Sequence, residues 1–187
     1  MLRDILTASQ NWASAAHYGK THNGHPTFEH LTEVVTKIYE FDNDEEVIAA
    51  GWLHDTLKYT DTQSWEISKT LSRRAARIVE LVTDPPGYNR LDIKAELYKN
   101  LWNESNAFIR ADAGFLKSVD RFCNQRNAIA TLNTEKIATY IAEFPDFIRF
   151  VANQMMHPTY RPGRHRLWTQ LFQQYQEMVR TLDGDLR

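Results

Sequence analysis

The sequence predicts a single all-α domain, with about eight to ten helices spread over residues 1–187. The 187 residues, 42% of them hydrophobic and 25% charged, match the size and composition of one globular domain. The 7 glycines and 6 prolines fall below the average shares of about 7% and about 5%, which favours long helices over turn-rich sheets. Apolar residues also recur every three or four positions along most of the chain, which is the spacing of an amphipathic helix.

Three helices are expected in the N-terminal third of the chain. A pattern compatible with one buried face covers residues 4–18, and the glycine that follows is a stop signal. A loop over residues 19–27 leads to a second apolar stripe, which predicts a helix over residues 28–41. Asp44, or the asparagine before it, can cap a third helix over residues 44–59, whose first turn holds two glutamates where the helix dipole favours them.

The rest of the chain shows further helical stretches with short apolar faces. They cover residues 65–71, 72–82, 91–101, 107–129, 134–156 and 167–179. Ser72 can cap the second of them, and the Pro-Pro-Gly sequence at 85–87 ends it. Pro145 predicts a break or kink near Phe144, and the sequence at 158–163 predicts a turn before the last helix.

Charge, hydropathy and cysteine content exclude several classes of protein. The formal net charge of −2 gives no overall positive field, so we expect neither extended nucleic acid nor an anionic membrane as a partner. No apolar run is long enough for a membrane span, and the N-terminus lacks the apolar segment of a signal peptide, so we expect a cytoplasmic protein. Cys123 is the single cysteine, so a metal would be held by histidines and carboxylates. The sequence gives no signal for the oligomeric state.

Several polar residues occupy positions where a helix should be apolar. Asp55 shares a stripe with Ile48 and Trp52, and His54 shares one with Val47 and Gly51. Asp120 lies among Leu116, Val119 and Cys123, and His30 begins the second helix beside its own apolar stripe. Neutral nitrogen donors and anionic oxygens directed to one core are what a divalent cation requires. Each residue alone also has an ordinary explanation, since a histidine can pack in a core and an aspartate can pair with an arginine such as Arg121 or Arg126.

The order of these residues resembles the motif of the HD-domain metal-dependent phosphohydrolases. The surrounding sequence is similar to the hydrolase domain of the Rel/Spo alarmone enzymes and the small alarmone hydrolases, which remove the 3′-pyrophosphate of (p)ppGpp with bound manganese. The similar segments are AHYGKTHNGHPTFEH, AAGWLHDTLKYTDT, IVELVTDPPGYNRLDIK and LKSVDRFCNQRNA. The likeness implies one HD domain with its metal-site core at about residues 10–130 and C-terminal helices over residues 131–187.

The resemblance also implies which residues hold the metal. They are His30, His54, Asp55 and Asp120. One divalent ion is expected, manganese first, although two nitrogen and two oxygen donors suit iron, cobalt or zinc as well.

The sequence departs from the family pattern at the acid/base positions. The Glu and Asp that follow the His-Asp pair in the alarmone hydrolases are replaced by Lys58 and Tyr59, and a protonated lysine cannot accept a proton from water. His22 stands where the family has a base-binding arginine, while Asn124 and Arg126 match positions that line the substrate pocket. Arg90 and Lys94 match a basic pair, but such a pair is also typical of a solvated helix face.

Three hypotheses follow. The first is a metal-dependent phosphohydrolase that acts on a nucleotide or related phosphate ester, with a (p)ppGpp-like compound as a candidate substrate. In this hypothesis Lys20, Lys58 and Arg126 neutralise phosphate charge and a metal-activated water is the nucleophile. The second is a catalytically weak or inactive HD-domain protein that binds a nucleotide, or a protein partner, and acts as a regulator. The third is a helical bundle whose acidic residues and histidines form internal pairs.

Other histidines and the tryptophans have structural interpretations. His17 near the end of the first helix is explained as an imidazolium that interacts favourably with the helix dipole. Trp52, Trp65 and Trp168 are expected in the core, whereas Trp102 is a candidate for a subunit contact.

Overall fold

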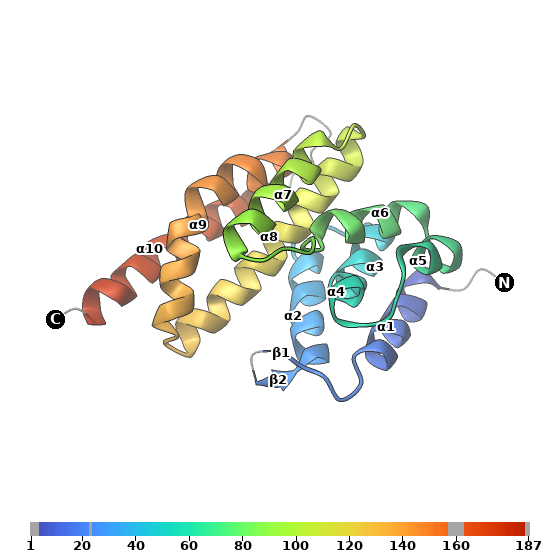
Figure 1. The fold of residues 1–187 in the computed structure, drawn as a ribbon, viewed down its shortest axis with the longest axis horizontal. Coiled ribbons are helices and arrows are strands. Elements are labelled where there is room, and N and C mark those ends of the chain that lie inside the picture. The colour runs from blue at the N-terminus through green and yellow to red at the C-terminus, as the bar shows by residue number, and fades with distance from the viewer. Residues whose placement is uncertain (1–3, 23, 157–162, 186–187) are drawn as a thin grey trace.

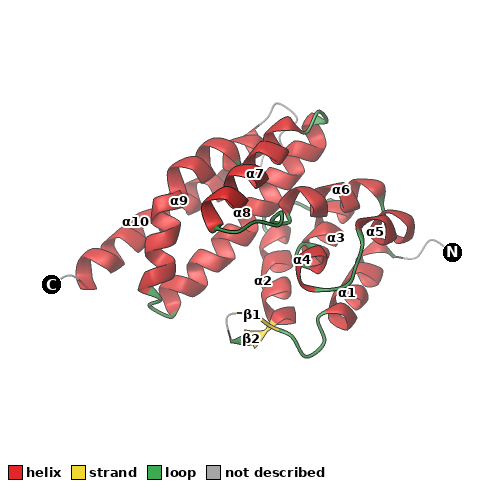
Figure 2. Cartoon of the chain, viewed as in Figure 1, coloured by secondary structure: helices red, strands yellow, loops and turns green. Residues whose placement is uncertain are grey.

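The structure, a computed structural model, describes residues 4–22, 24–156 and 163–185, and within these ranges it is almost entirely helical (Figure 1, Figure 2). The elements are, in chain order, α1 (Ile5–Ala16), β1 (Thr21–His22), β2 (His25–Pro26), α2 (Thr27–Tyr39), α3 (Glu45–Leu53), α4 (Thr56–Tyr59), α5 (Ser64–Thr70), α6 (Arg73–Val82), α7 (Arg90–Asn103), α8 (Ala107–Ala130), α9 (Thr134–Phe150), the 3-10 helix η1 (Ala152–Met156) and α10 (His165–Asp185). The predicted all-α fold is confirmed.

Helix α8 is the element on which most of the others pack. Its 24 residues make it about 36 Å long, and it contacts α2, α3, α6, α7, α9, α10 and η1. Figure 1 shows α8 crossing between α1 to α6 on one side and α7, α9 and α10 on the other. Phe115, Leu116 and Val119 of this helix are fully buried in the main hydrophobic core. A side chain in the middle of α8 therefore faces the interior of the whole fold.

The segment expected to form one long third helix is two helices separated by a turn. Helix α3 ends at Leu53 and α4 begins at Thr56, so His54 and Asp55 lie in the turn between them. Thr56 Oγ1 donates a hydrogen bond to the Leu53 carbonyl (2.6 Å), and His54 Nδ1 donates one to the Gly51 carbonyl (2.8 Å). The prediction of a continuous helix was wrong here, because such side-chain hydrogen bonds compete with the helical ladder.

The loop expected between the first two helices contains a small hairpin. Strands β1 and β2 pair antiparallel, with His22 opposite His25. Gly19 and Gly24 adopt positive φ angles of 72° and 85°, which only glycine adopts without strain, and these bends direct the hairpin back to the start of α2.

Of the break or kink expected near Phe144, the break is absent, since α9 continues through Pro145 to Phe150 and the change to η1 comes at Val151. Phe144 and Phe147, on either side of the proline, are 5% and 1% exposed, so their packing compensates for the lost backbone hydrogen bond.

Two further expectations concern Trp65 and the last turn. Trp65 is 64% exposed, so its expected place in the core was wrong, whereas Trp52 is buried as expected. Residues 158–162 of the expected turn lie outside the described residues. Among the described helices, none combines the length and the apolar character needed to cross a membrane. The single-domain boundaries and the cytoplasmic location stay predictions.

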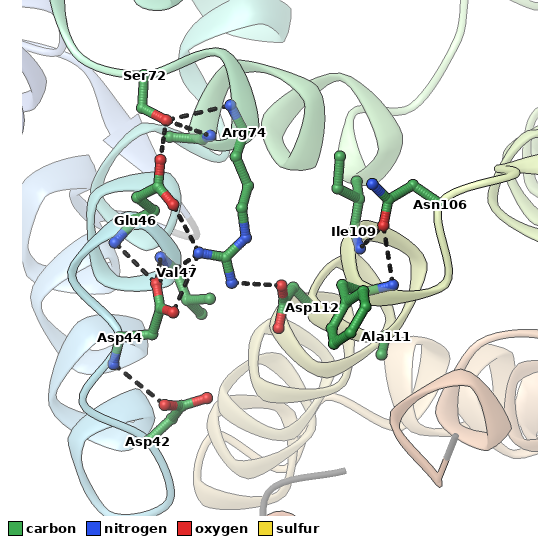
Figure 3. Close-up of polar contacts among 12 residues, drawn as sticks. Asp42, Asp44, Glu46, Val47, Ser72, Arg74, Asn106, Ile109, Ala111 and Asp112 are labelled. Atoms are coloured by element: carbon green, nitrogen blue, oxygen red, sulfur yellow. Dashed lines mark hydrogen bonds and ion pairs between the residues drawn. The ribbon is translucent and has the colours of Figure 1, made fainter. Parts of the chain in front are cut away.

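An ionic network joins the first half of α8 to the helices beside it (Figure 3). Arg74 contacts Asp44 (2.9 Å), Glu46 (2.7 Å) and Asp112 (2.6 Å). Asp44 also caps α3, and Ser72 caps α6, which confirms both predicted helix starts. One guanidinium thus fixes the starts of α3 and α6 against α8.

A second arginine on the other side of Asp112 is fully buried. Arg164 has a side chain that is 2% exposed, and it contacts Asp42 and Asp112 while its guanidinium lies 4.3 Å from the centre of the Phe115 ring. Asp42 follows α2, so this contact ties the segment before α10 to the link between α2 and α3.

Replacing Arg164 is expected to destabilise the fold. Arg164→Met should lower the free energy of unfolding by about 3–5 kcal/mol, because it removes a positive partner from two buried carboxylates, although Asp112 retains Arg74. Urea unfolding followed by circular dichroism measures the change. Arg166→Met is the matched control, since this exposed residue donates to the Glu40 carbonyl, and its expected effect is below about 1 kcal/mol. Equal losses in both variants would contradict the prediction.

Candidate metal centre

Three segments far apart in the chain bring His30, His54, Asp55 and Asp120 to one place beside α8. His30 lies in the first turn of α2, His54 and Asp55 form the turn after α3, and Asp120 lies in the middle of α8. The distance from Asp120 Oδ1 is 3.4 Å to His30 Nε2 and 3.9 Å to His54 Nε2, and His54 Nε2 lies 3.6 Å from Asp55 Oδ2. Ligand atoms that share one ion with bonds of about 2.0–2.2 Å have separations in this range.

The unpartnered nitrogens of the two histidines fit a divalent cation. His54 Nδ1 donates to the Gly51 carbonyl, so its Nε2 carries the lone pair, and a hydrogen bond of this kind is what orients metal-bound histidines. Nε2 of His30 and Nε2 of His54 are both buried without a hydrogen-bond partner among the described residues. Leaving such atoms unsatisfied is costly, and a cation between them and the carboxylates satisfies all four groups.

Close packing of α3 on α2 helps to place this turn. A Cβ at Gly51 would lie 2.5 Å from Ile38 Cδ1 and 3.3 Å from Val35 Cγ2, so a larger residue would require the Ile38 side chain to move. The carbonyl of Gly51 also holds the His54 ring, and the glycine therefore supports the position of a candidate ligand.

Neighbouring charges keep Asp120 ionised. Although burial raises the pKa of Asp120, the Lys117 ammonium 3.1 Å away and the imidazoles of His30 and His54 hold it well below its usual range. Burial lowers the pKa of His30, but the nearby carboxylates of Asp120, Asp55 and Glu33 together raise it by more. The centre therefore offers a fixed anionic oxygen, and metal binding at His30 competes with a proton.

The metal centre opens into a cavity of about 220 Å³ that we call the cationic cavity. Its lining residues are His22, Asp55, Lys58, Tyr59, Asp84, Arg90, Lys94, Lys117, Asp120, Arg121, Asn124, Lys136 and Tyr140. Six of them are lysines or arginines and three are aspartates, so the cavity carries an excess of positive charge although the whole chain is slightly acidic. Such a cavity suits an anionic ligand beside the cation.

Four residues expected to act on the substrate line the cationic cavity. Lys58 binds Asp84 (2.8 Å); burial lowers the pKa of Lys58, but the hydrogen bonds and charges of Asp84 and Tyr59 together raise it above its ordinary value. Tyr59 is 46% exposed beside it. His22 and Asn124 face each other, with His22 Nε2 and Asn124 Oδ1 3.1 Å apart, and burial lowers the pKa of His22.

Lys20 and Arg126 lie outside the lining of the cationic cavity. The Lys20 ammonium donates to the Tyr59 carbonyl at the surface. Arg126 is exposed and pairs with Glu33 of α2 at 3.2 Å. Arg121, which was considered as a partner for a buried aspartate, binds Glu143 at 2.7 Å instead.

Several residues of the cationic cavity could not be identified from the sequence. Lys117 was not singled out, although it lies three residues before Asp120, a spacing that puts both on one face of α8. Lys94, for which a solvated position was the alternative, is 8% exposed and binds Asp84 at 2.5 Å. Burial and the nearby Lys117 lower the pKa of Lys94 to about 8. No sequence motif identified Asp84, which joins Lys58 and Lys94.

The interpretation of His17 as an imidazolium was wrong. His17 is 3% exposed, and burial lowers its pKa, so the ring is neutral. The helix ends at Ala16, and the Asp55 carboxylate acts on the His17 ring in the opposite direction to burial but by less.

Comparison with known proteins places the chain in a family. A family profile described as "HD domain" matches residues 9–108, more than half of the chain. A guanosine-3′,5′-bis(diphosphate) 3′-pyrophosphohydrolase of Aquifex aeolicus is 38% identical over 82 residues, which are 44% of this chain and 12% of that protein. A probable enzyme of the same name from Synechocystis sp. is 29% identical over 136 residues, 71% of this chain and 18% of the relative. The chain thus spans less than a fifth of these relatives.

A solved structure has the same fold over nearly the whole chain. It is described as a metazoan orthologue of SpoT that hydrolyses ppGpp, and it matches with a TM-score of 0.73 and 18% sequence identity over 95% of this chain and 97% of that one. HD domains bind a divalent metal, and the His and Asp residues described above are a possible site for it. From the match of the family profile, the chain belongs to the HD domain family.

Proposed function

We propose that the protein is a metal-dependent phosphohydrolase that acts on a nucleotide or related phosphate ester, with a (p)ppGpp-like compound as the first candidate. The observation that carries this proposal is the position of the cationic cavity, which adjoins a His and Asp centre suited to a divalent cation. The named activity of the two bacterial relatives supports the choice of substrate class.

His30, His54, Asp55 and Asp120 are the residues we assign to the cation. Manganese is the first candidate because the sequence resembles manganese-dependent alarmone hydrolases, and the donor set also suits iron, cobalt or zinc. A divalent cation in this position supplies Lewis-acid activation of a phosphoryl group and of a water molecule. The residues of the chain bind, orient and neutralise the substrate.

Phosphate charge is neutralised by the cationic cavity. Lys58 and Lys94 share the Asp84 carboxylate, and Arg90 and Arg121 share Glu143, so each pair is held in place while retaining hydrogen-bond donors for an anion. A lysine acts on phosphate as a point charge and an arginine as a planar fork. Lys58 therefore acts through its charge and not as a base, and Tyr59 lies at the open side of the cavity.

The alternative is a catalytically weak or inactive HD domain that binds a nucleotide as a regulator. The ion pair of Lys58 with Asp84 favours it, because a cation occupies the position expected to handle the proton of water. Release of phosphate or pyrophosphate from a mixed nucleotide panel in the presence of manganese supports the hydrolase, whereas binding without turnover supports the regulator.

Metal removal is expected to destabilise the protein. A cation at 100 times its Kd stabilises the fold by about 2.7 kcal/mol, so a chelator should lower the Tm by about 5–10 °C and added metal should restore it. Differential scanning calorimetry measures this shift. The shift should persist in His25→Ala and disappear in His54→Ala. A Tm that does not respond to the chelator would favour the bundle with internal ion pairs.

Lys58→Glu is expected to raise alarmone hydrolysis. A carboxylate at this position can accept a proton from water, and general base catalysis contributes about 10²–10⁴-fold. The measurement is pyrophosphate release from ppGpp with manganese present, and Lys69→Glu on the exposed face of α5 is the control with the same charge change. A folded, metal-binding Lys58→Glu variant without a gain in turnover would speak for the regulatory alternative.

Nucleotide binding is expected to weaken as the pH rises through about 8. The pKa of Lys94 is lowered to about 8, so its ammonium is present below that pH and lost above it. Losing one charged contact to phosphate should reduce affinity about 10-fold. Calorimetric titration of a non-hydrolysable nucleotide between pH 7 and about 9 tests this. In Lys94→Arg the decrease should disappear, and an unchanged profile in that variant would contradict the role of Lys94.

A further inference from the structure

His22 lies against the metal centre, although the sequence analysis assigned it to the substrate. It ends β1, and its ring stacks on that of His30 with the ring centres 4.2 Å apart and the planes 7° from parallel. Its side chain borders both the cationic cavity and a smaller polar pocket on the side of His25 and Glu29. The ring therefore forms part of the wall of the metal centre.

Asn124 determines which nitrogen of His22 carries the proton. The Asn124 side-chain nitrogen donates to Asp120 Oδ1 (2.5 Å) and to the Asp120 carbonyl (3.1 Å), so its Oδ1 must be the atom that faces His22. His22 Nε2 donates to this oxygen at 3.1 Å, which leaves the lone pair on Nδ1. His54 has the same arrangement with its nitrogens exchanged, because its Nδ1 donates to a carbonyl. Hydrogen bonds of this kind orient metal-binding histidines.

The distances place His22 in a group of candidate ligands that includes His30 and Asp55 of the metal centre. One ligand atom each from His22, His30 and Asp55 lie within 4.8 Å of one another, and so do atoms of His30, His54 and Asp120. Both groups contain His30, and Asp55 directly follows His54, so the two groups adjoin each other. Ligands on opposite sides of an ion are about 4.2 Å apart for bonds of about 2.1 Å, so the atoms within each group need to approach by less than about 1 Å. The His22 ring must also turn from its parallel stack on His30, because the nitrogen lone pair lies in the ring plane.

We propose that His22 is a further ligand of the divalent cation, so that the centre offers three imidazole nitrogens and two carboxylates. The proposal rests on the metal centre of the proposed function and adds a residue to it. A third imidazole favours iron, cobalt or zinc over manganese, because nitrogen donors suit those ions and oxygen donors suit manganese. A neutral donor also increases the affinity for the cation without placing another carboxylate beside Lys58.

Two other roles are compatible with the position of His22, and they differ in what they predict. A residue that only contacts the substrate leaves metal affinity unchanged when it is replaced. If His22 only packs on His30, another flat ring can replace it without a loss of metal affinity. His22→Phe separates these roles, since phenylalanine retains the stacking surface but has no lone pair.

The test is cobalt and manganese binding by the full chain. Wild type, His22→Phe and His25→Ala are freed of metal, checked for folding by circular dichroism and titrated with Co(II) or Mn(II) against a chromophoric chelator. In His22→Phe we expect cobalt affinity to fall by at least about 10-fold, manganese affinity to fall less, and the ligand-field absorption of bound Co(II) to change. His25→Ala, on the opposite strand with its side chain 63% exposed, should match the wild type.

Three results would overturn the proposal. Unchanged cobalt affinity and absorption in His22→Phe would show that His22 is not a ligand, while the metal centre of the proposed function would stand. Two ions per wild-type chain, of which His22→Phe loses one, would show a separate site. A wild-type chain that binds neither ion would remove this proposal and the proposed function together.

Discussion

The carboxylate of Asp120 lies in the middle of α8, the helix on which most of the core packs. A buried carboxylate without partners costs roughly several kcal/mol, so the fold must bring compensating groups to it. Lys117 and Asn124 do so from one turn on either side, and His30 and His54 reach it from α2 and the end of α3. The helix that organises the hydrophobic core thus also determines where the start of α2 and the turn after α3 lie.

Most helices could be predicted from the sequence because their causes are local. Apolar spacing identified the buried faces, and the caps at Asp44 and Ser72 identified two starts. The errors occur where contacts between distant residues override a local preference. The core packing of Phe144 and Phe147 keeps α9 helical through Pro145. The turn after α3 likewise depends on hydrogen bonds that no periodicity indicates.

The metal centre and the cationic cavity differ in how far the sequence reveals them. Polar residues on apolar stripes are anomalous, so His30, His54, Asp55 and Asp120 could be singled out before any coordinates. A lysine or an arginine on a helix is ordinary, so Lys117 and the other cations carried no such signal. Their convergence on one cavity comes from packing α4, α7, α8 and α9 together, which pairs residues far apart in the chain.

The positive charge of Lys58, three residues after Asp55, connects the two proposals. A lysine there instead of a carboxylate adds attraction for a phosphorylated ligand, but it also repels a metal ion in the same cavity. Asp84 offsets part of that repulsion by binding both Lys58 and Lys94. A neutral imidazole from His22 strengthens the hold on the ion without cancelling the positive charge that the ligand requires. A lysine at position 58 and the proposed coordination by His22 are therefore electrostatically compatible.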